Sequence, residues 1–173
     1  MNEAALEACF RNLYAELNRS LEARAGGPFA AAVVRDGVLL GTGTNTVLRD
    51  LDVTRHAEMN ALAAAGRKAG SVHLDGAVLL TTHLPCLMCY NAAKWARVRE
   101  VYYLFDYRET EELFGFRGDL RLLRDLGLSP KALEADPAIR LSRFSTPLVD
   151  GLYRRELLEL WRTSYRDLAS YDV

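Results

Sequence analysis

The hydrophobic pattern of the first 45 residues predicts a helix followed by two strands. Apolar residues recur at three- and four-residue intervals over residues 3–24, which is typical of an amphipathic helix. These residues are Leu6, Phe10, Leu13, Leu17 and Leu21. The segment ends at Gly26, and two β-rich runs follow within residues 28–45. Because Asp36 and Gly37 between the runs fit a two-residue type I′ turn, we expect two antiparallel strands.

The centre of the chain alternates between helical and strand-like segments. Residues 56–69 have helical composition, and the sequence AVLLTT at residues 77–82 is typical of a buried strand. A second pair follows, with a predicted helix over 86–96 and a buried strand over 101–105. Strand, helix and strand at this spacing predict a right-handed βαβ unit with parallel strands.

The last third of the chain is more polar and less regular. Residues 109–128 are charged and predicted to be helical. Prolines at 130, 137 and 147 then interrupt a looser segment. A final amphipathic helix is predicted over about 152–168.

Length and composition indicate one ordinary globular domain. The chain has 173 residues, of which 50% are hydrophobic and 26% charged, so we expect a single domain over 1–173 with a C-terminal helical segment at about 130–173. With 22 basic and 23 acidic residues there is no global positive field, so a nucleic-acid partner is not expected. The N-terminus is acidic and lacks a stretch that could span a bilayer, which predicts a soluble cytoplasmic protein without a membrane partner.

Two short motifs carry the candidate chemistry. His56 and Glu58 lie at the start of one predicted helix, and Cys86 and Cys89 at the start of another. Cysteines at positions i and i+3 can turn both sulfurs toward one point, and a helix start stabilises thiolate charge. Histidine with two cysteines would hold zinc by three protein ligands, which leaves a fourth position for water. Glu58 would then take a proton from that water and pass it to a leaving group.

Each half of this arrangement also has a simpler explanation. Glu58 could be a charge on a helix surface, His56 a core histidine, and the Cys-x-x-Cys a redox pair or a structural zinc site. The ordered combination of His-x-Glu and Pro-Cys-x-x-Cys matches the signature of zinc-dependent deaminases, which favours a catalytic zinc. The other histidines, His73 and His83, are expected to be solvated or packed rather than ligands.

Through these residues the sequence resembles the cytidine deaminase-like superfamily, in the branch that contains bacterial guanine deaminases and tRNA adenosine deaminases. The likeness runs over about 28–105, through GGPFAAAVVRDG, GTGTN, HAEMNAL and PCLMCYNAAKWA. It implies an α/β fold, a three-layer α/β/α sandwich with a mixed five-stranded central sheet. It also implies that Zn²⁺ is held by His56, Cys86 and Cys89, and that Glu58 is the catalytic proton shuttle.

The resemblance also implies how a substrate would be bound. Asn45, at the end of the second strand, would hydrogen-bond the ring of the base, and Phe29 would line the pocket. The backbone N–H groups of Ala57 and Cys86 would help to fix the substrate or the water, as helix starts can.

The choice of base depends on the residues beyond the cysteines. In tRNA-acting relatives an Asp-x-Lys-x-Gly-Ala stretch follows the next strand, whereas this chain has LFDYRETEELFGF. The run KWAR at 94–97 resembles guanine deaminases, in which an acidic residue further along assists with the purine. By position that residue is Asp119, with Glu112 as the second choice.

The expected activity is therefore hydrolytic deamination of a small free base. Guanine, giving xanthine and ammonia, is the first choice, and ammeline, guanosine and cytosine are alternatives. A tRNA adenosine deaminase and a non-catalytic protein with a structural zinc remain as competing hypotheses. Relatives with this signature pair through helices beside the site, so we expect a homodimer whose C-terminal segment covers the active site or the subunit interface.

Overall fold

The computed structural model describes residues 3–147, 151 and 154–164. Its first half comprises α1 (Glu3–Glu22), β1 (Ala30–Arg35), β2 (Val38–Thr44), α2 (Val47–Asp50), α3 (Ala57–Ala69) and β3 (Val78–His83). Its second half comprises α4 (Leu87–Trp95), β4 (Glu100–Phe105), α5 (Tyr107–Phe114), α6 (Gly118–Asp125), α7 (Pro130–Glu134), β5 (Arg140–Arg143) and α8 (Arg154–Ser164).

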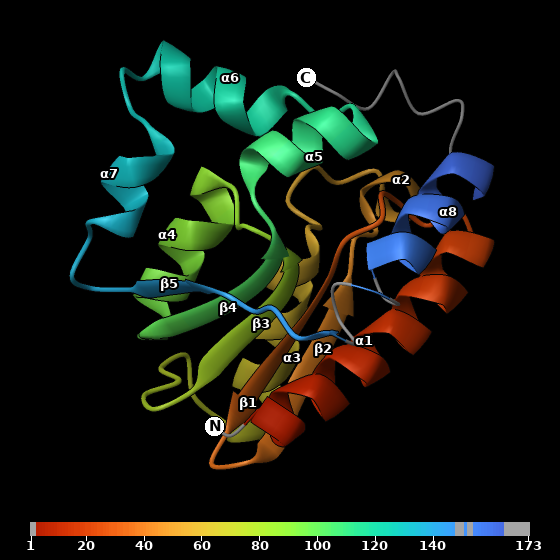
Figure 1. Ribbon diagram of the computed structural model, residues 1–173. Coiled ribbons are helices and arrows are strands. Elements are labelled where there is room, and N and C mark those ends of the chain that lie inside the picture. Colours follow the sequence, from red (N-terminus) through yellow and green to blue (C-terminus); the bar gives the residue numbers. More distant parts are fainter. Residues whose placement is uncertain (1–2, 148–150, 152–153, 165–173) are drawn as a thin grey trace.

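The strands form one mixed five-stranded sheet in the order β2-β1-β3-β4-β5, as expected (Figure 1). β1 is antiparallel to both β2 and β3, whereas β3, β4 and β5 run parallel to one another. Asp36 and Gly37 both have positive φ, 51° and 77°, in agreement with the predicted type I′ turn. The helix between β3 and β4 is α4, which completes the predicted βαβ unit.

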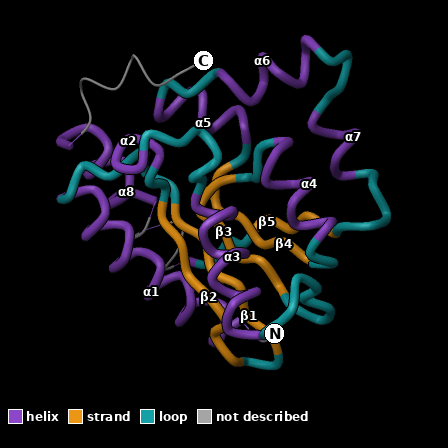
Figure 2. The backbone as a smooth tube through the Cα atoms, turned by 180° about the vertical axis from the view of Figure 1, so that it is seen from behind, coloured by secondary structure: helices purple, strands orange, loops and turns teal. Residues whose placement is uncertain are grey.

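Helices cover both faces of the sheet, so the fold has three layers. Alternate residues of β1 show the division: Ala31 and Val33 pack in a core with α3 and α4, while Ala32 and Val34 pack with α1 and α8. The predicted apolar positions of α1 are its buried residues. Figure 2 shows α3 and α4 on the face of the sheet opposite to α1.

Close packing of α3 against β2 depends on two glycines. A Cβ atom on Gly41 would lie 2.6 Å from Ala65 N, and one on Gly43 would lie 2.4 Å from Ala57 O. Neither distance is sterically tolerable, so only glycine lets the helix approach the strand this closely. The GTGTN stretch thereby places the start of α3 beside the end of β2.

The structure corrects the interpretation of the C-terminal third. The predicted helical stretch 109–128 is two helices, because Gly115 adopts a left-handed conformation at φ 78° and ends α5. The looser segment contains α7 and the edge strand β5, whose sequence RLSR has no apolar alternation. The last predicted helix is present as α8, and residues 148–150, 152–153 and 165–173 of the expected C-terminal segment lie outside the described residues.

Within the described ranges, no helix combines the length and the apolar character needed to cross a membrane.

Candidate active site

Three metal-ligand side chains converge at the starts of α3 and α4. His56 is the N-cap residue of α3, Cys86 is the N-cap residue of α4, and both have extended backbone conformations. Cys89 lies one turn further along α4. His56 Nδ1 is 3.5 Å from Cys86 Sγ and 3.6 Å from Cys89 Sγ.

The spacing of these donor atoms fits a tetrahedral zinc ion. A nitrogen at 2.0–2.1 Å and a sulfur at 2.3 Å from one tetrahedral ion should be about 3.6 Å apart. Within residues 3–147, 151 and 154–164, this is the one group of at least three such side chains whose donor atoms converge, all within 4.8 Å. Three protein ligands leave one tetrahedral position for water or substrate.

The charges of the donor set suit a cation as well. A hydrogen bond from Cys89, helped by His56, lowers the pKa of the Cys86 thiol to about 4 despite its burial. The same bond raises the pKa of Cys89, because its thiol proton is shared with the Cys86 thiolate. Burial lowers the pKa of His56, but the hydrogen bond to Cys86 and the nearby negative charges outweigh it and raise this pKa to about 9. A cation would displace these shared protons.

Glu58 lies in the first turn of α3 with only 5% of its surface exposed. The hydroxyl of Thr81, in β3, donates a hydrogen bond of 3.0 Å to Glu58 Oε1. Burial raises the pKa of the Glu58 carboxyl, and the negative charge of Cys86 raises it further. The carboxyl is also within interaction range of Cys89, which places it beside the three converging donors.

Asn45 and Phe29, the expected base-contacting residues, are joined at the end of the β1–β2 hairpin. The Asn45 N–H donates to Phe29 O at 3.0 Å, and Asn45 Oδ1 accepts from Val47 N at 3.2 Å. Asn45 is buried and packs directly on Gly26, where a Cβ atom would meet Asn45 Oδ1 at 2.1 Å. Ala57, the first residue of α3, is fully buried next to the site.

The structure distinguishes between the two acidic candidates beyond the cysteines. Asp119 lies in the first turn of α6, and its charge raises the pKa of His56. Burial raises the pKa of Tyr107, at the start of α5, and the charge of Asp119 raises this pKa further. Glu112 is exposed on α5. The fold thus brings Asp119 into electrostatic contact with the site.

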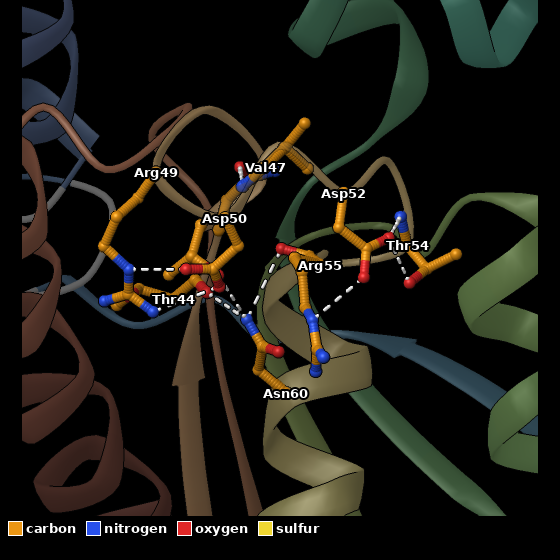
Figure 3. Close-up of polar contacts among 10 residues, drawn as sticks. Thr44, Val47, Arg49, Asp50, Asp52, Thr54, Arg55 and Asn60 are labelled. Carbon is orange, nitrogen blue, oxygen red and sulfur yellow. Dashed lines mark hydrogen bonds and ion pairs between the residues drawn. The ribbon is translucent and has the colours of Figure 1, made fainter.

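Two residues that were not predicted from the sequence, Asn60 and Tyr107, form hydrogen bonds to the segments that carry the site residues. Asn60 Nδ2 donates to Thr44 O at 2.9 Å and to Thr46 Oγ1 at 3.1 Å, and so ties the end of β2 to the first turn of α3 (Figure 3). Tyr107 donates its hydroxyl to Pro85 O at 2.5 Å, next to Cys86. Asn60 is a polar residue one turn after His56, which was a usable signal, whereas nothing local marked Tyr107.

Polar contacts among its own residues also order the segment between Asn45 and His56, which connects β2 to α3. Asp50 accepts from Arg49 and Thr46, and Asp52 accepts from Thr54 and pairs with Arg55 (Figure 3). These bonds give the segment between Asn45 and His56 a defined shape.

His83 is packed, as expected, and is not among the converging donors. Its ring lies 4.6 Å from Phe29, 5.0 Å from Phe105 and 5.0 Å from Phe114 between centroids. Burial, together with the charge of Arg154, lowers the pKa of His83 to about 3, so the ring is neutral at physiological pH.

The proteins of known sequence or structure that this chain resembles include guanine deaminases and tRNA-specific adenosine deaminases. A guanine deaminase from Bacillus subtilis is 39% identical over 87 residues, which cover 50% of this chain and 56% of that protein. A tRNA-specific adenosine deaminase from Agrobacterium fabrum is 38% identical over 88 residues, covering 48% and 58%. The chain thus matches little more than half the length of these relatives. The solved guanine deaminase of Nitrosomonas europaea has a TM-score of 0.67 at 28% identity, covering 94% of this chain and 83% of that one.

The family assignment follows from the part of the chain that holds the site. Residues 4–105 match the model of the cytidine and deoxycytidylate deaminase zinc-binding region. This match runs from α1 through β4 and includes His56, Glu58 and both cysteines of α4. The chain therefore belongs to the cytidine and deoxycytidylate deaminase family.

Proposed function

We propose that this protein is a zinc-dependent deaminase of a free purine base, with guanine converted to xanthine and ammonia as the leading reaction. The observation that carries the proposal is the buried Glu58 carboxyl beside the converging His56, Cys86 and Cys89 side chains. A structural zinc site or a redox cysteine pair would not require a buried carboxyl at this position, and burying one is costly. Hydrolytic deamination does require it, because a proton must be moved.

The roles of the residues follow from their chemistry. His56, Cys86 and Cys89 would hold zinc, which would supply Lewis-acid chemistry that makes water more acidic. Glu58 takes a proton from the attacking water molecule and returns it to the amino group of the base. The water oxygen bonds to the ring carbon that carries the amino group, the C–N bond breaks, and the nitrogen leaves as ammonia. The raised pKa of Glu58 suits a group that must both accept and donate a proton.

Four residues are proposed to hold the base. Asn45 offers a buried amide at the end of β2. Phe29, whose backbone oxygen accepts a hydrogen bond from the Asn45 N–H, offers an aromatic ring to line the pocket. The N–H of Ala57 lies at the start of a 13-residue helix, where backbone donors are free to bind a polar atom. Asp119 supplies a carboxylate that can accept N–H groups of a purine, and its charge already reaches His56.

A panel of substrates tests the proposal. Ammonia release by the zinc-loaded protein would be measured with guanine, guanosine, adenine, cytosine, ammeline and a tRNA with an anticodon adenosine, with Glu58→Gln as the control. We expect release from guanine that the control lacks. Release from ammeline, guanosine or cytosine alone would support the deaminase activity but show that guanine is not the substrate. No release from any of them would contradict the proposal.

A tRNA adenosine deaminase is the second candidate, supported by the 38% identity to the Agrobacterium fabrum enzyme. Two observations count against it. The net charge is −1, and Asp119 places a negative charge beside the site, whereas affinity for a nucleic-acid backbone comes largely from lysine and arginine contacts to phosphate. Release of ammonia from the tRNA alone would favour this candidate.

We further propose that residues 1–173 act as a single deaminase domain in a homodimer that forms through the helices beside the site. Trp95, at the end of α4, supports this proposal because 83% of its surface is exposed. Sedimentation equilibrium of the wild-type protein and of Trp95→Lys tests it, since the substitution should yield monomers.

A further inference from the structure

Thr81 contacts the proposed proton shuttle from the middle of the sheet. It lies in β3, where it pairs with Ala31 of β1 on one side and Tyr103 of β4 on the other. Its side chain is fully buried, and its hydroxyl lies 3.0 Å from Glu58 Oε1. The bond joins α3 to an inner strand of the sheet at the site itself.

A buried glutamate needs such a contact to hold one conformation. The side chain has three rotatable bonds, and an unpartnered carboxylate in a dry site would move toward any polar group within reach. β3 is held by neighbours on both edges, so its backbone gives the hydroxyl a fixed position. Thr is also stiff at χ1, because both Oγ1 and the methyl group are attached to Cβ.

We propose that Thr81 is a positioning residue that holds the Glu58 carboxyl in one orientation at the site. The Thr81 hydroxyl donates to Oε1 from a fixed point of β3, and this bond also limits where Oε2 can lie, because the two oxygens belong to one planar group. Without the bond the side chain is free to turn about its rotatable bonds toward other polar groups. This inference rests on the proposed role of Glu58.

Three variants separate positioning from a general effect on the fold. Thr81→Val keeps the shape and removes the hydroxyl, and Thr81→Ser keeps the hydroxyl. Thr110→Val removes a buried hydroxyl of α5 that donates to the backbone oxygen of Asp106, the N-cap residue of that helix. Zinc content, KM and kcat would be measured for each with the best substrate of the panel. Thr81→Ala repeats the test if the valine variant does not fold.

We expect Thr81→Val to keep its zinc and a KM within about twofold of the wild type, while kcat falls roughly tenfold to a hundredfold, as when a reacting group is misplaced. Thr81→Ser should recover kcat to within about threefold, and Thr110→Val should keep kcat. A zinc-loaded Thr81→Val with wild-type kcat, or a serine variant as slow as the valine one, would overturn the inference.

A second measurement needs no substrate. Thr81→Val is made in the wild type and in Glu58→Ala, and the melting temperatures of the four proteins form a double-mutant cycle. We expect Thr81→Val to lower the melting temperature in the wild type and not in the Glu58→Ala background. An equal loss of melting temperature in both backgrounds would show that Thr81 does not stabilise the protein through Glu58 and would overturn the inference. Failure of the proposed function appears separately, as a wild-type protein that releases no ammonia from any substrate.

Discussion

His56 Nδ1 lies 3.5 Å from Cys86 Sγ, although 30 residues separate the two along the chain. Each residue is the N-cap of its own helix, so the contact depends on how α3 and α4 are placed on the sheet. α3 follows β2 and α4 follows β3, and the sheet brings the two helix starts to one place. The contact would allow side chains from two helices to hold one metal ion.

Replacing a cysteine of α4 should remove the metal. Cys86→Ser and Cys89→Ser each lose a thiolate ligand, and an alcohol is a much poorer ligand for zinc. We expect zinc content, measured by atomic emission after dialysis, to fall from about one ion per chain to a small fraction of that. Cys9→Ser, on α1, is the matched control and should keep its zinc. Full zinc in either α4 variant would mean that the ligands are assigned wrongly.

Removing the Glu58 carboxylate should separate metal binding from catalysis. Glu58→Gln keeps the shape and loses the group that accepts the proton, so zinc should remain while kcat falls by about two orders of magnitude or more. Glu134→Gln, an exposed residue of α7, serves as the control and should keep kcat. A Glu58→Gln variant with wild-type turnover would falsify the mechanism.

The two acidic candidates should behave differently in substrate binding. Asp119 is proposed to accept N–H groups of the base, so Asp119→Asn should raise KM for the base about tenfold with zinc unchanged, as expected for the loss of one charged hydrogen bond. Glu112→Gln, on the exposed side of α5, should leave KM unchanged. Steady-state kinetics with both variants decides the matter, and the reverse pattern would assign the role to Glu112.

His83 should make the fold less stable in acid. Its pKa is 6.5 when unfolded and about 3 in the folded protein, so below pH 6.5 the unfolded chain binds a proton that the folded chain does not. The free energy of unfolding is therefore unaffected by this group above pH 6.5 and decreases as the pH falls from 6.5 toward 3. Between pH 6.5 and 5 this loss amounts to about 2 kcal/mol.

The measurement is urea unfolding of the wild type and of His83→Leu at pH 7 and pH 5. The leucine variant should lose less free energy of unfolding between the two pH values than the wild type. An unchanged pH difference in His83→Leu would show that His83 is not the titrating group.

The sequence by itself determined what depends on local spacing. The 3–4 periodicity over residues 3–24 predicted the buried face of α1, and Asp36-Gly37 predicted the hairpin turn. His56, Cys86 and Cys89 were recognisable as a candidate zinc site because their residue types and intervals are those that zinc binding requires.

The tertiary structure decided what depends on long-range pairing. β5 has the polar sequence RLSR and is a strand only because β4 offers it a parallel edge. The charge of Asp119 acts on His56 only because the fold brings α6 within electrostatic range of the start of α3, and Thr81 meets Glu58 only because α3 packs against β3 at that position. The hydrophobic period of an element determines which face each of its residues occupies. The partners of that residue belong to other elements, and only the packed fold brings those elements together.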